Sequence, residues 1–320
     1  MPRSETATPS LAAMPRPLRI LLVALGFLLL YGGAVEPRLL LDDHAFEAEL
    51  PALPPGWDGQ TLALLADFQV GMWLDNPGTV EAAVEDAIGD SVAAVLVAGD
   101  FVYKPDRAKI REAAELMRPL GEAGVPVVAV LGNHDYSVMK EHSEVREDLG
   151  DALRRELEAV GVTVLENDAA PLVAGGDTLW IAGVGSTWAE RADVGATLAA
   201  VPEGAPRVWL MHNSEAFRDI PGEEAHLALA GHTHGGQMGL FPGETNSWLD
   251  IVREGEVAAD GWAADSIGKP PNRIYINRGI GFSGVPVRIN CRPELTLITL
   301  KTPTGRVPSR GPGAVEVTDS

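Results

Sequence analysis

Beyond residue 60, short apolar runs alternate along the chain with stretches whose apolar residues recur at helical spacing. Apolar runs bounded by turn residues are typical of buried strands, and helical spacing is typical of amphipathic helices. The runs predict strands near 61–66, 92–98, 125–131, 162–165, 171–174 and 178–183, with later strands leading to His212 and His232. The amphipathic stretches predict helices near 78–89, 107–123, 143–160 and 190–200. Strands that alternate with helices favour an α/β fold.

The two ends of this region have a different pattern. Three late apolar segments predict antiparallel strands at 273–277, 285–289 and 294–300. Residues 302–320 are rich in Pro, Gly and Ser, which predicts a disordered tail. Residues 38–60 contain several prolines and predict a tether that includes a first edge strand. The expected catalytic domain is therefore 61–301.

The longest apolar run lies near the N-terminus. Residues 20–30 are apolar without interruption and follow Arg16 and Arg19, an arrangement typical of a leader. For segment 1–37 two interpretations stay open: a signal peptide cleaved after Ala34, or an uncleaved signal anchor, although the run is short for a span of ~20 residues. A buried core helix is the remaining alternative. Because arginines stay inside, both leader interpretations predict a catalytic part on the outer (periplasmic or extracellular) side of the cytoplasmic membrane, or secretion after cleavage.

Composition narrows the classes of function. The chain has 320 residues, 46% of them hydrophobic, which is enough for one large domain with a core. The 45 acidic and 25 basic residues give a net charge of −20, which would repel nucleic acid, so we expect no nucleic-acid partner. The single cysteine, Cys291, excludes an internal disulfide framework and a cysteine metal cluster.

Several apolar runs end directly at residues that can bind a metal: Asp67, Asp100, Asn133 with His134, His212, and His232 with His234. Ligands bind beyond the carboxyl ends of strands in open α/β sheets, so we expect these side chains at one edge of one sheet. Oxygen and imidazole ligands at this density predict a divalent metal site with room for two ions. Two such ions activate water and neutralise phosphate oxygens, which makes phosphate-ester hydrolysis the expected chemistry.

The two residues that follow Asn133 are candidates for catalysis. His134 could act as a general acid or donate a hydrogen bond to the phosphoryl oxygens. Asp135 could hold His134 in its working tautomer, as carboxylates do for imidazoles in metal sites. The sequence therefore predicts His134 and Asp135 as the catalytic residues beside the metals.

In order along the chain, these motifs resemble the pattern D-x-H, GD, GNH[DE], H and GHxH of the calcineurin-like metallophosphoesterases. They read Asp67-Phe68-Gln69, Gly99-Asp100, Gly132-Asn133-His134-Asp135, Met211-His212 and Gly231-His232-Thr233-His234. The resemblance covers roughly residues 55–300, and the C-terminal part also resembles the membrane-associated bacterial branch of YaeI-like and YkuE-like phosphodiesterases. It implies two packed mixed β-sheets flanked by helices, an αββα sandwich of the α/β (α+β) class, here with an N-terminal hydrophobic segment.

The resemblance also implies roles for individual residues. Asp67 and His234 would hold a first metal, Asp100 would bridge, and a second metal would be held by Asn133, His212 and His232. Gln69 departs from the family pattern, because it stands where a first-metal histidine is usual. Its amide oxygen is a neutral and weaker ligand, so the first site either fills with a preference for Mn²⁺ or Mg²⁺ over iron, or is loose. The expected cofactors are two divalent ions, Mn²⁺ before Mg²⁺, Zn²⁺ or iron.

We therefore expect a dinuclear phosphoesterase that hydrolyses phosphodiesters or phosphomonoesters by attack of a metal-bridging hydroxide. Because the N-terminal segment would hold the site near a membrane, a membrane-associated or lipid-headgroup substrate is expected. The alternative is a degenerate, one-metal or inactive domain that acts as a binding or sensor module, since Gln69 replaces a histidine. Segment 241–272, with Trp248 and Trp262, is interpreted as a lid, a membrane-contacting patch or an ordinary packed loop.

Overall fold

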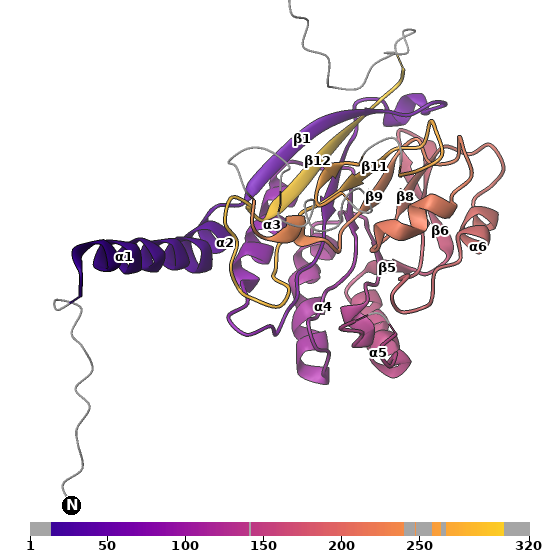
Figure 1. Ribbon diagram of the computed structural model, residues 1–320. Coiled ribbons are helices and arrows are strands. Elements are labelled where there is room, and N and C mark those ends of the chain that lie inside the picture. The colour runs from indigo at the N-terminus through magenta and orange to yellow at the C-terminus, as the bar shows by residue number, and fades with distance from the viewer. Residues whose placement is uncertain (1–13, 141, 240–246, 248–257, 264–266, 304–320) are drawn as a thin grey trace, which may run out of the picture.

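Two six-stranded β-sheets packed face to face form the centre of the molecule, and helices lie against their outer faces (Figure 1). This computed structural model describes residues 14–140, 142–239, 247, 258–263 and 267–303. The arrangement confirms the predicted sandwich of two mixed sheets flanked by helices.

The first sheet has the strand order β1-β12-β2-β3-β4-β5. Its strands are β1 (Asp42–Glu49), β2 (Thr61–Leu65), β3 (Ala94–Val97), β4 (Val127–Val130), β5 (Val162–Leu165) and β12 (Glu294–Lys301). Strands β2 to β5 are parallel, whereas β12 runs antiparallel to β2 and parallel to β1. The helices that follow β2, β3 and β4 are α3 (Pro77–Gly89), α4 (Arg107–Glu122) and α5 (Glu147–Ala159).

The second sheet has the strand order β10-β11-β9-β8-β7-β6. Its strands are β6 (Asp168–Ala174), β7 (Asp177–Gly183), β8 (Arg207–Leu210), β9 (Ala228–Ala230), β10 (Gly261–Trp262) and β11 (Ile274–Ile276). Strands β7, β8, β9 and β11 are parallel, and β6 and β10 are antiparallel edge strands. Apart from the N-terminal segment, the other helical elements of the described chain are α6 (Val194–Ala200) and the 3₁₀ turns η3 (Pro55–Trp57), η4 (His134–Tyr136), η5 (Ser214–Asp219) and η6 (His234–Gly236).

Strand β2 shows why the central strands are apolar on both faces. Leu62 and Leu64 pack against the second sheet, while Ala63 and Leu65 pack among α3, α4 and α5. Burying each leucine side chain contributes ~1.5–3 kcal/mol, so the sandwich holds the ends of these strands in fixed positions.

The late apolar segments differ from the prediction in two respects. Strand β11 is antiparallel to β10 but parallel to its other neighbour, β9, whereas β12 is antiparallel to β2 as expected. Residues 285–289 form no strand, which corrects the prediction there. Pro286 has no N–H to donate, and the N–H groups of Arg288 and Ile289 bind the carbonyls of Gly32 and Gln237 instead.

The N-terminal apolar segment is one continuous helical stretch that projects from the domain (Figure 1). It comprises α1 (Arg16–Leu30), a π-helical turn η2 (Tyr31–Val35) and α2 (Glu36–Leu39). The 24-residue helix is long and apolar enough to cross a membrane, and no residue of α1 is buried, so a buried core helix is excluded for α1.

The segment expected as a tether, 38–60, carries the expected edge strand. Strand β1 pairs with β12 along its whole length, so this part of the chain is fixed to the first sheet. Of segment 241–272, most residues, including Trp248, lie outside the described part, as does the tail from 304. Trp262 packs in β10 against the rings of Phe46 and Tyr275.

Candidate metal centre

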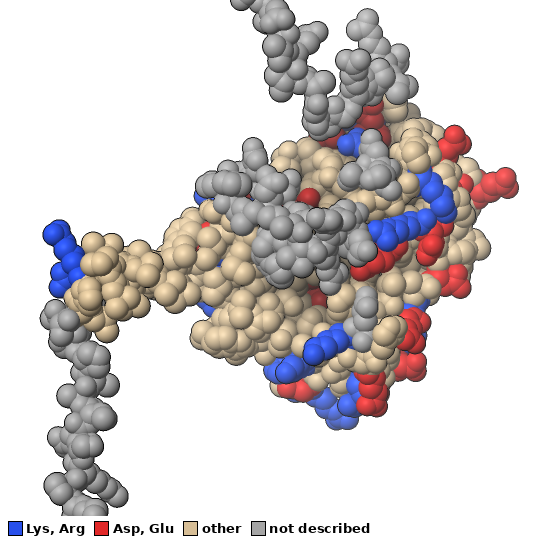
Figure 2. All heavy atoms as spheres, viewed as in Figure 1, with Lys and Arg blue, Asp and Glu red and all other residues tan. Residues whose placement is uncertain are grey.

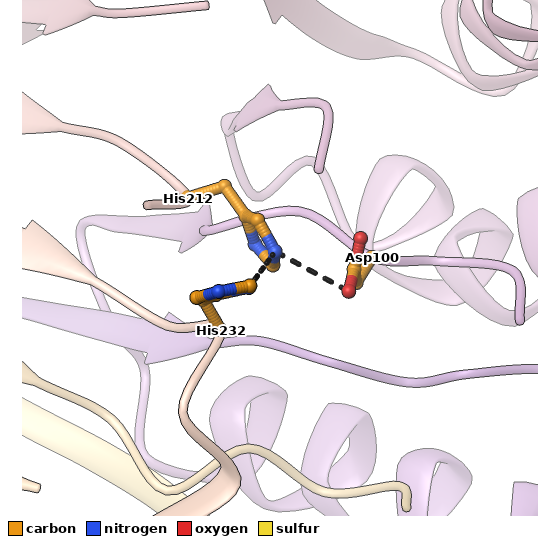
Figure 3. Close-up of side chains that lie close together, drawn as sticks. All are labelled: Asp100, His212 and His232. Carbon is orange, nitrogen blue, oxygen red and sulfur yellow. Dashed lines mark hydrogen bonds and ion pairs between the residues drawn. The ribbon is translucent and has the colours of Figure 1, made fainter. Parts of the chain in front are cut away.

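The predicted ligands meet where the carboxyl ends of strands from both sheets come together. Asp67, Asp100 and Asn133 follow β2, β3 and β4 of the first sheet, while His212 and His232 follow β8 and β9 of the second. The expectation of one edge of a single sheet is therefore corrected, because the facing strands of the sandwich end on the same side. Figure 3 shows Asp100, His212 and His232 directed toward one another.

The backbone at this edge adopts an unusual conformation. Five non-glycine residues have φ between 53° and 76°: Asp67, Gln69, Asp100, His232 and His234. The left-handed region costs an L-residue roughly 1–2 kcal/mol, so it persists only where surrounding structure imposes it. Such strain gathers at functional sites, where it aims side chains inward.

His212 lies at the centre of one group of ligands. Its Nδ1 donates to the carbonyl of Ala98 at 2.7 Å, so Nε2 faces the site and carries a lone pair in the neutral ring. Three polar atoms surround Nε2: Asn133 Oδ1 at 3.1 Å, Asp100 Oδ2 at 3.2 Å and His232 Nδ1 at 3.2 Å.

The orientation of the Asn133 amide is fixed independently, because its Nδ2 donates to the carbonyl of Val138 at 2.7 Å. Its oxygen must therefore face the lone pair of His212, which is unfavourable unless a cation or a proton lies between them. Burial alone would lower the pKa of His212, but the Asp100 carboxylate outweighs it and raises that pKa to about 9.

A second group of ligands shares Asp100. The ligand atoms of Asp67, Asp100 and His234 lie within 4.8 Å of one another, as do those of Asp100, His212 and His232. Burial raises the pKa of Asp67 to about 7. Burial acts in the same direction on Asp100, but the neighbouring imidazoles of His212 and His134 hold its pKa below its ordinary value. Asp100 therefore stays ionised between the two groups, and this position suits a bridging ligand.

Gln69 lies inside the second group. Its Nε2 donates to Asp100 Oδ2 at 2.8 Å and lies 3.4 Å from His234 Nε2. Its Oε1 is buried and has no hydrogen-bond partner among the described residues, and the same holds for His234 Nδ1. A buried acceptor without a donor is costly, and a cation would satisfy it once the amide turns over.

Residues 61–236, more than half of the chain, match the model of the calcineurin-like phosphoesterase family. The chain belongs to this family. It is therefore a metallophosphoesterase, a hydrolase of phosphoric esters, and its residue groups fit divalent metal ions.

Named relatives place the metallophosphoesterase in a bacterial branch. It is 27% identical to the uncharacterized metallophosphoesterase YkuE of Bacillus subtilis, over 85% of this chain and 89% of the relative. It is 30% identical to the phosphodiesterase YaeI of Escherichia coli, over 64% of this chain and 69% of the relative. Among solved structures, Haemophilus influenzae NAD nucleotidase (NadN) matches with a TM-score of 0.41 and 13% identity, over 70% of this chain and 45% of that one.

His134 of the metallophosphoesterase motif lies beside the two groups of ligands and belongs to neither. Its Nδ1 donates to the carbonyl of Tyr103 at 2.9 Å, and its ring stacks on the Tyr103 ring with centroids 5.0 Å apart. Its Nε2 lies 4.0 Å from Asp100 Oδ2. A main-chain carbonyl, not Asp135, therefore sets the His134 tautomer, which corrects the expected role of Asp135.

Asp135 has a different function in the site. Its buried carboxylate accepts the main-chain N–H groups of Asp100 at 3.0 Å, Val102 at 3.0 Å and Gly132 at 2.9 Å. It thereby ties the loop after β3 to the loop after β4 and is a positioning residue for the ligands on both loops.

The motif glycines permit the close approach of these loops. A Cβ on Gly132 would lie 2.2 Å from Asp100 Oδ1, and one on Gly99 would lie 2.6 Å from the Gly132 nitrogen. A side chain at either position would therefore clash with Asp100 or with the backbone beside it.

The metal centre forms one wall of a cleft of about 310 Å³. Its other walls contain residues that the sequence reasoning did not single out: Met139, Trp188, Glu215, Gln237, Met238, Ser283 and Val285. The ring of Trp188 meets that of His232 edge-on, with centroids 4.5 Å apart. Gln237 could have been found from the sequence because it follows the GHTHGG motif directly, whereas no local signal marks Trp188 or Val285.

Proposed function

We propose that the chain is a dinuclear metal-dependent phosphoesterase at the outer face of the cytoplasmic membrane, hydrolysing phosphodiester or phosphomonoester bonds of a membrane-associated substrate. The observation that carries the proposal is the convergence of Asn133, Asp100 and His232 on the Nε2 lone pair of His212. Acceptor atoms gathered in this way repel one another, and they become a favourable ligand set when a cation lies between them.

Asn133, His212 and His232 would hold one ion, Asp67 and His234 with the amide oxygen of Gln69 would hold the other, and Asp100 would contribute to both. When bound, two divalent cations would supply hydroxide at neutral pH and neutralise charge on the phosphate oxygens. The share of carboxylate and amide oxygens favours Mn²⁺ over Zn²⁺ or iron as the native ion.

His134 acts on the substrate from beside the ions. Because its Nδ1 proton is committed to the Tyr103 carbonyl, Nε2 has a proton only when the ring is an imidazolium. The imidazolium donates its Nε2 proton to a phosphoryl oxygen or to the leaving-group oxygen, both of which gain negative charge in the reaction.

One observation favours the alternative, a one-metal or inactive binding module. The Gln69 amide nitrogen donates to the carboxylate of Asp100, which the second group must also offer to a metal. If this hydrogen bond persists, the Asp67 and His234 side of the centre stays empty.

The test uses the full chain in detergent, stripped of metal, with Mn²⁺, Mg²⁺ or Zn²⁺ added back. Hydrolysis of a soluble aryl phosphodiester and an aryl phosphomonoester is measured with Asp100→Asn as the blank and His44→Ala, on the exposed edge strand β1, as a histidine control. We expect metal-dependent turnover in the wild type and in the His44 variant, and none in the blank. Turnover at the level of the blank with every metal would sink the enzyme proposal and favour the binding module.

A further inference from the structure

Exposed apolar side chains gather where the N-terminal helix joins the domain. Outside residues 18–31, six large apolar side chains in the described part of the chain are exposed, and only Val173 lies elsewhere. The other five form what we call the helix-base patch: Leu39 (72% exposed), Trp73 (62%), Leu74 (64%), Met238 (41%) and Val285 (50%).

Two of the segments that carry the patch contact the helix end. The Arg38 guanidinium donates to the carbonyl of Leu74, next to Trp73. On the other side, the N–H of Arg288 donates to the carbonyl of Gly32 at 2.8 Å, and Gly33 approaches the carbonyl of Pro286, which follows Val285.

The same helix end is fixed rigidly to the domain. Glu36 is fully buried, and its carboxylate accepts the N–H groups of Asn290 at 3.0 Å and Cys291 at 2.5 Å. The carbonyl of Pro37 accepts the side chains of Asn76 at 2.9 Å and Thr79 at 3.0 Å. The cleft therefore has a fixed orientation relative to the axis of the helix.

The length of the projecting part of the helix indicates what surrounds the patch. Residues 31–39 lie against the domain, which leaves the 15 residues of α1 to project. At 1.5 Å per residue α1 extends about 22 Å, whereas the hydrocarbon core of a bilayer is ~30 Å thick. The docked end and the patch around it supply the missing apolar thickness if the helix crosses a membrane.

The distribution of charge agrees with this placement. On the face that Figure 2 shows, the visible acidic and basic side chains of the domain lie mostly on the side away from α1, and the visible described surface beside the base of the helix is mainly uncharged. Trp73 is also the residue type that prefers the boundary between lipid and water.

We propose that the helix-base patch is a docking surface for a phospholipid bilayer, and that it seats the mouth of the cleft in the lipid interface. Met238 and Val285 belong to the patch and also line the cleft, so the cleft opens at the surface that the bilayer covers. Phosphate esters carried by lipids would then enter from the membrane; this last consequence rests on the proposed phosphoesterase function.

Docking is tested with the full chain reconstituted in phosphatidylcholine nanodiscs. Trp73→Cys and the matched control Val173→Cys, which is 68% exposed on the edge strand β6, are each labelled with an environment-sensitive fluorophore. The native Cys291 is 2% exposed and contributes little labelling in the folded protein. Lipids with brominated acyl chains should quench the label at position 73 and leave that at 173 unchanged.

Equal and weak quenching at both positions would overturn the proposal. The proposal would also be overturned if the fluorescence of the label at position 73 did not change with bromination of the lipids but fell when each disc held fewer copies of the chain. The patch would then contact a second copy of the chain.

The catalytic consequence is tested with Trp73→Ser/Leu74→Ser. Because two apolar contacts with the bilayer are removed, hydrolysis of a single-chain acylated aryl phosphodiester in vesicles should fall about tenfold, with hydrolysis of the soluble aryl diester unchanged. Loss of both activities to the same degree, or of neither, would contradict the lipid-side entry. If the wild type hydrolyses neither ester, the phosphoesterase function fails, and docking is still decided by the quenching result.

Discussion

The two groups of ligands that share Asp100 differ in how their outer atoms are held. In the His212 group, Asn133 and His212 each bind a main-chain carbonyl on the side away from the centre, so their ligand atoms face inward before any ion arrives. In the Asp67 group, Gln69 Oε1 and His234 Nδ1 have no partner in the described structure, and the Gln69 amide binds Asp100 instead. Each group contains one amide and at least one imidazole, so the ligand types alone do not separate them. The hydrogen bonds on the side away from the centre show that the His212 group is preorganised.

The largest effect should come from the residue that both groups share. Asp100→Asn removes the one firm anion of the centre, so turnover should fall by ~10³-fold or more and both ions should bind weakly. Turnover of the soluble aryl diester and metal content by mass spectrometry check this. Activity within tenfold of wild type would show that Asp100 does not join the two groups.

Variants of one amide ligand in each group should have smaller effects on turnover, and these should differ between the groups. Asn133→Ala removes a preorganised ligand and should lower turnover by ~10²-fold, as loss of an oriented polar group at a charged centre does. Gln69→Ala should lower it by less than about tenfold, because the Gln69 amide nitrogen faces Asp100 and its oxygen is not held ready for an ion. The two variants are compared at saturating Mn²⁺, and the reverse order of effects would break the comparison.

Replacing the weak ligand should strengthen the weaker group. Gln69→His restores an imidazole beside Asp67 and His234 and should tighten the weaker ion about tenfold, with a shift of preference toward Zn²⁺ or iron. Gln69→Asn, which keeps the amide on a shorter side chain, is the control. Unchanged metal affinity in Gln69→His would show that position 69 does not reach the ion.

The smallest effect on the chemistry should come from Asp135, which acts through the loops. Asp135→Asn exchanges one carboxylate oxygen for an amide nitrogen that cannot accept an N–H, so unfolding free energy should fall by ~1–3 kcal/mol. The loss should affect metal-free protein as well, as measured by denaturant unfolding without metal. A change in turnover with no change in stability would instead indicate direct contact with the substrate.

The sequence predicted the central strands, and the residues that gather at their ends, because both depend on local order. An apolar run such as 61–66 marks a strand buried on both faces, and the residue after it, Asp67, must lie at that strand's end. That the ends belong to two sheets could not be predicted from the runs, since the assignment of β8 and β9 to a second sheet depends on pairing across long distances.

Other differences have the same origin. Residues 285–289 have an apolar pattern like that of a strand, but their N–H groups are used by the N-terminal helix and by Gln237, which lie far away in sequence. Asp135 was expected to bind its neighbour His134, yet three main-chain N–H groups from two loops surround its carboxylate. Each miss concerns a contact that only the folded chain creates.

The most direct test of the unequal groups is a titration of the metal-free full chain with Mn²⁺, with free Mn²⁺ counted by electron paramagnetic resonance. The account predicts two bound ions with affinities at least about tenfold apart; Asn133→Ala should weaken mainly the tighter ion, and Gln69→Ala should weaken the other ion modestly. Two ions of equal affinity, or a tighter ion whose affinity is unchanged in Asn133→Ala, would contradict it.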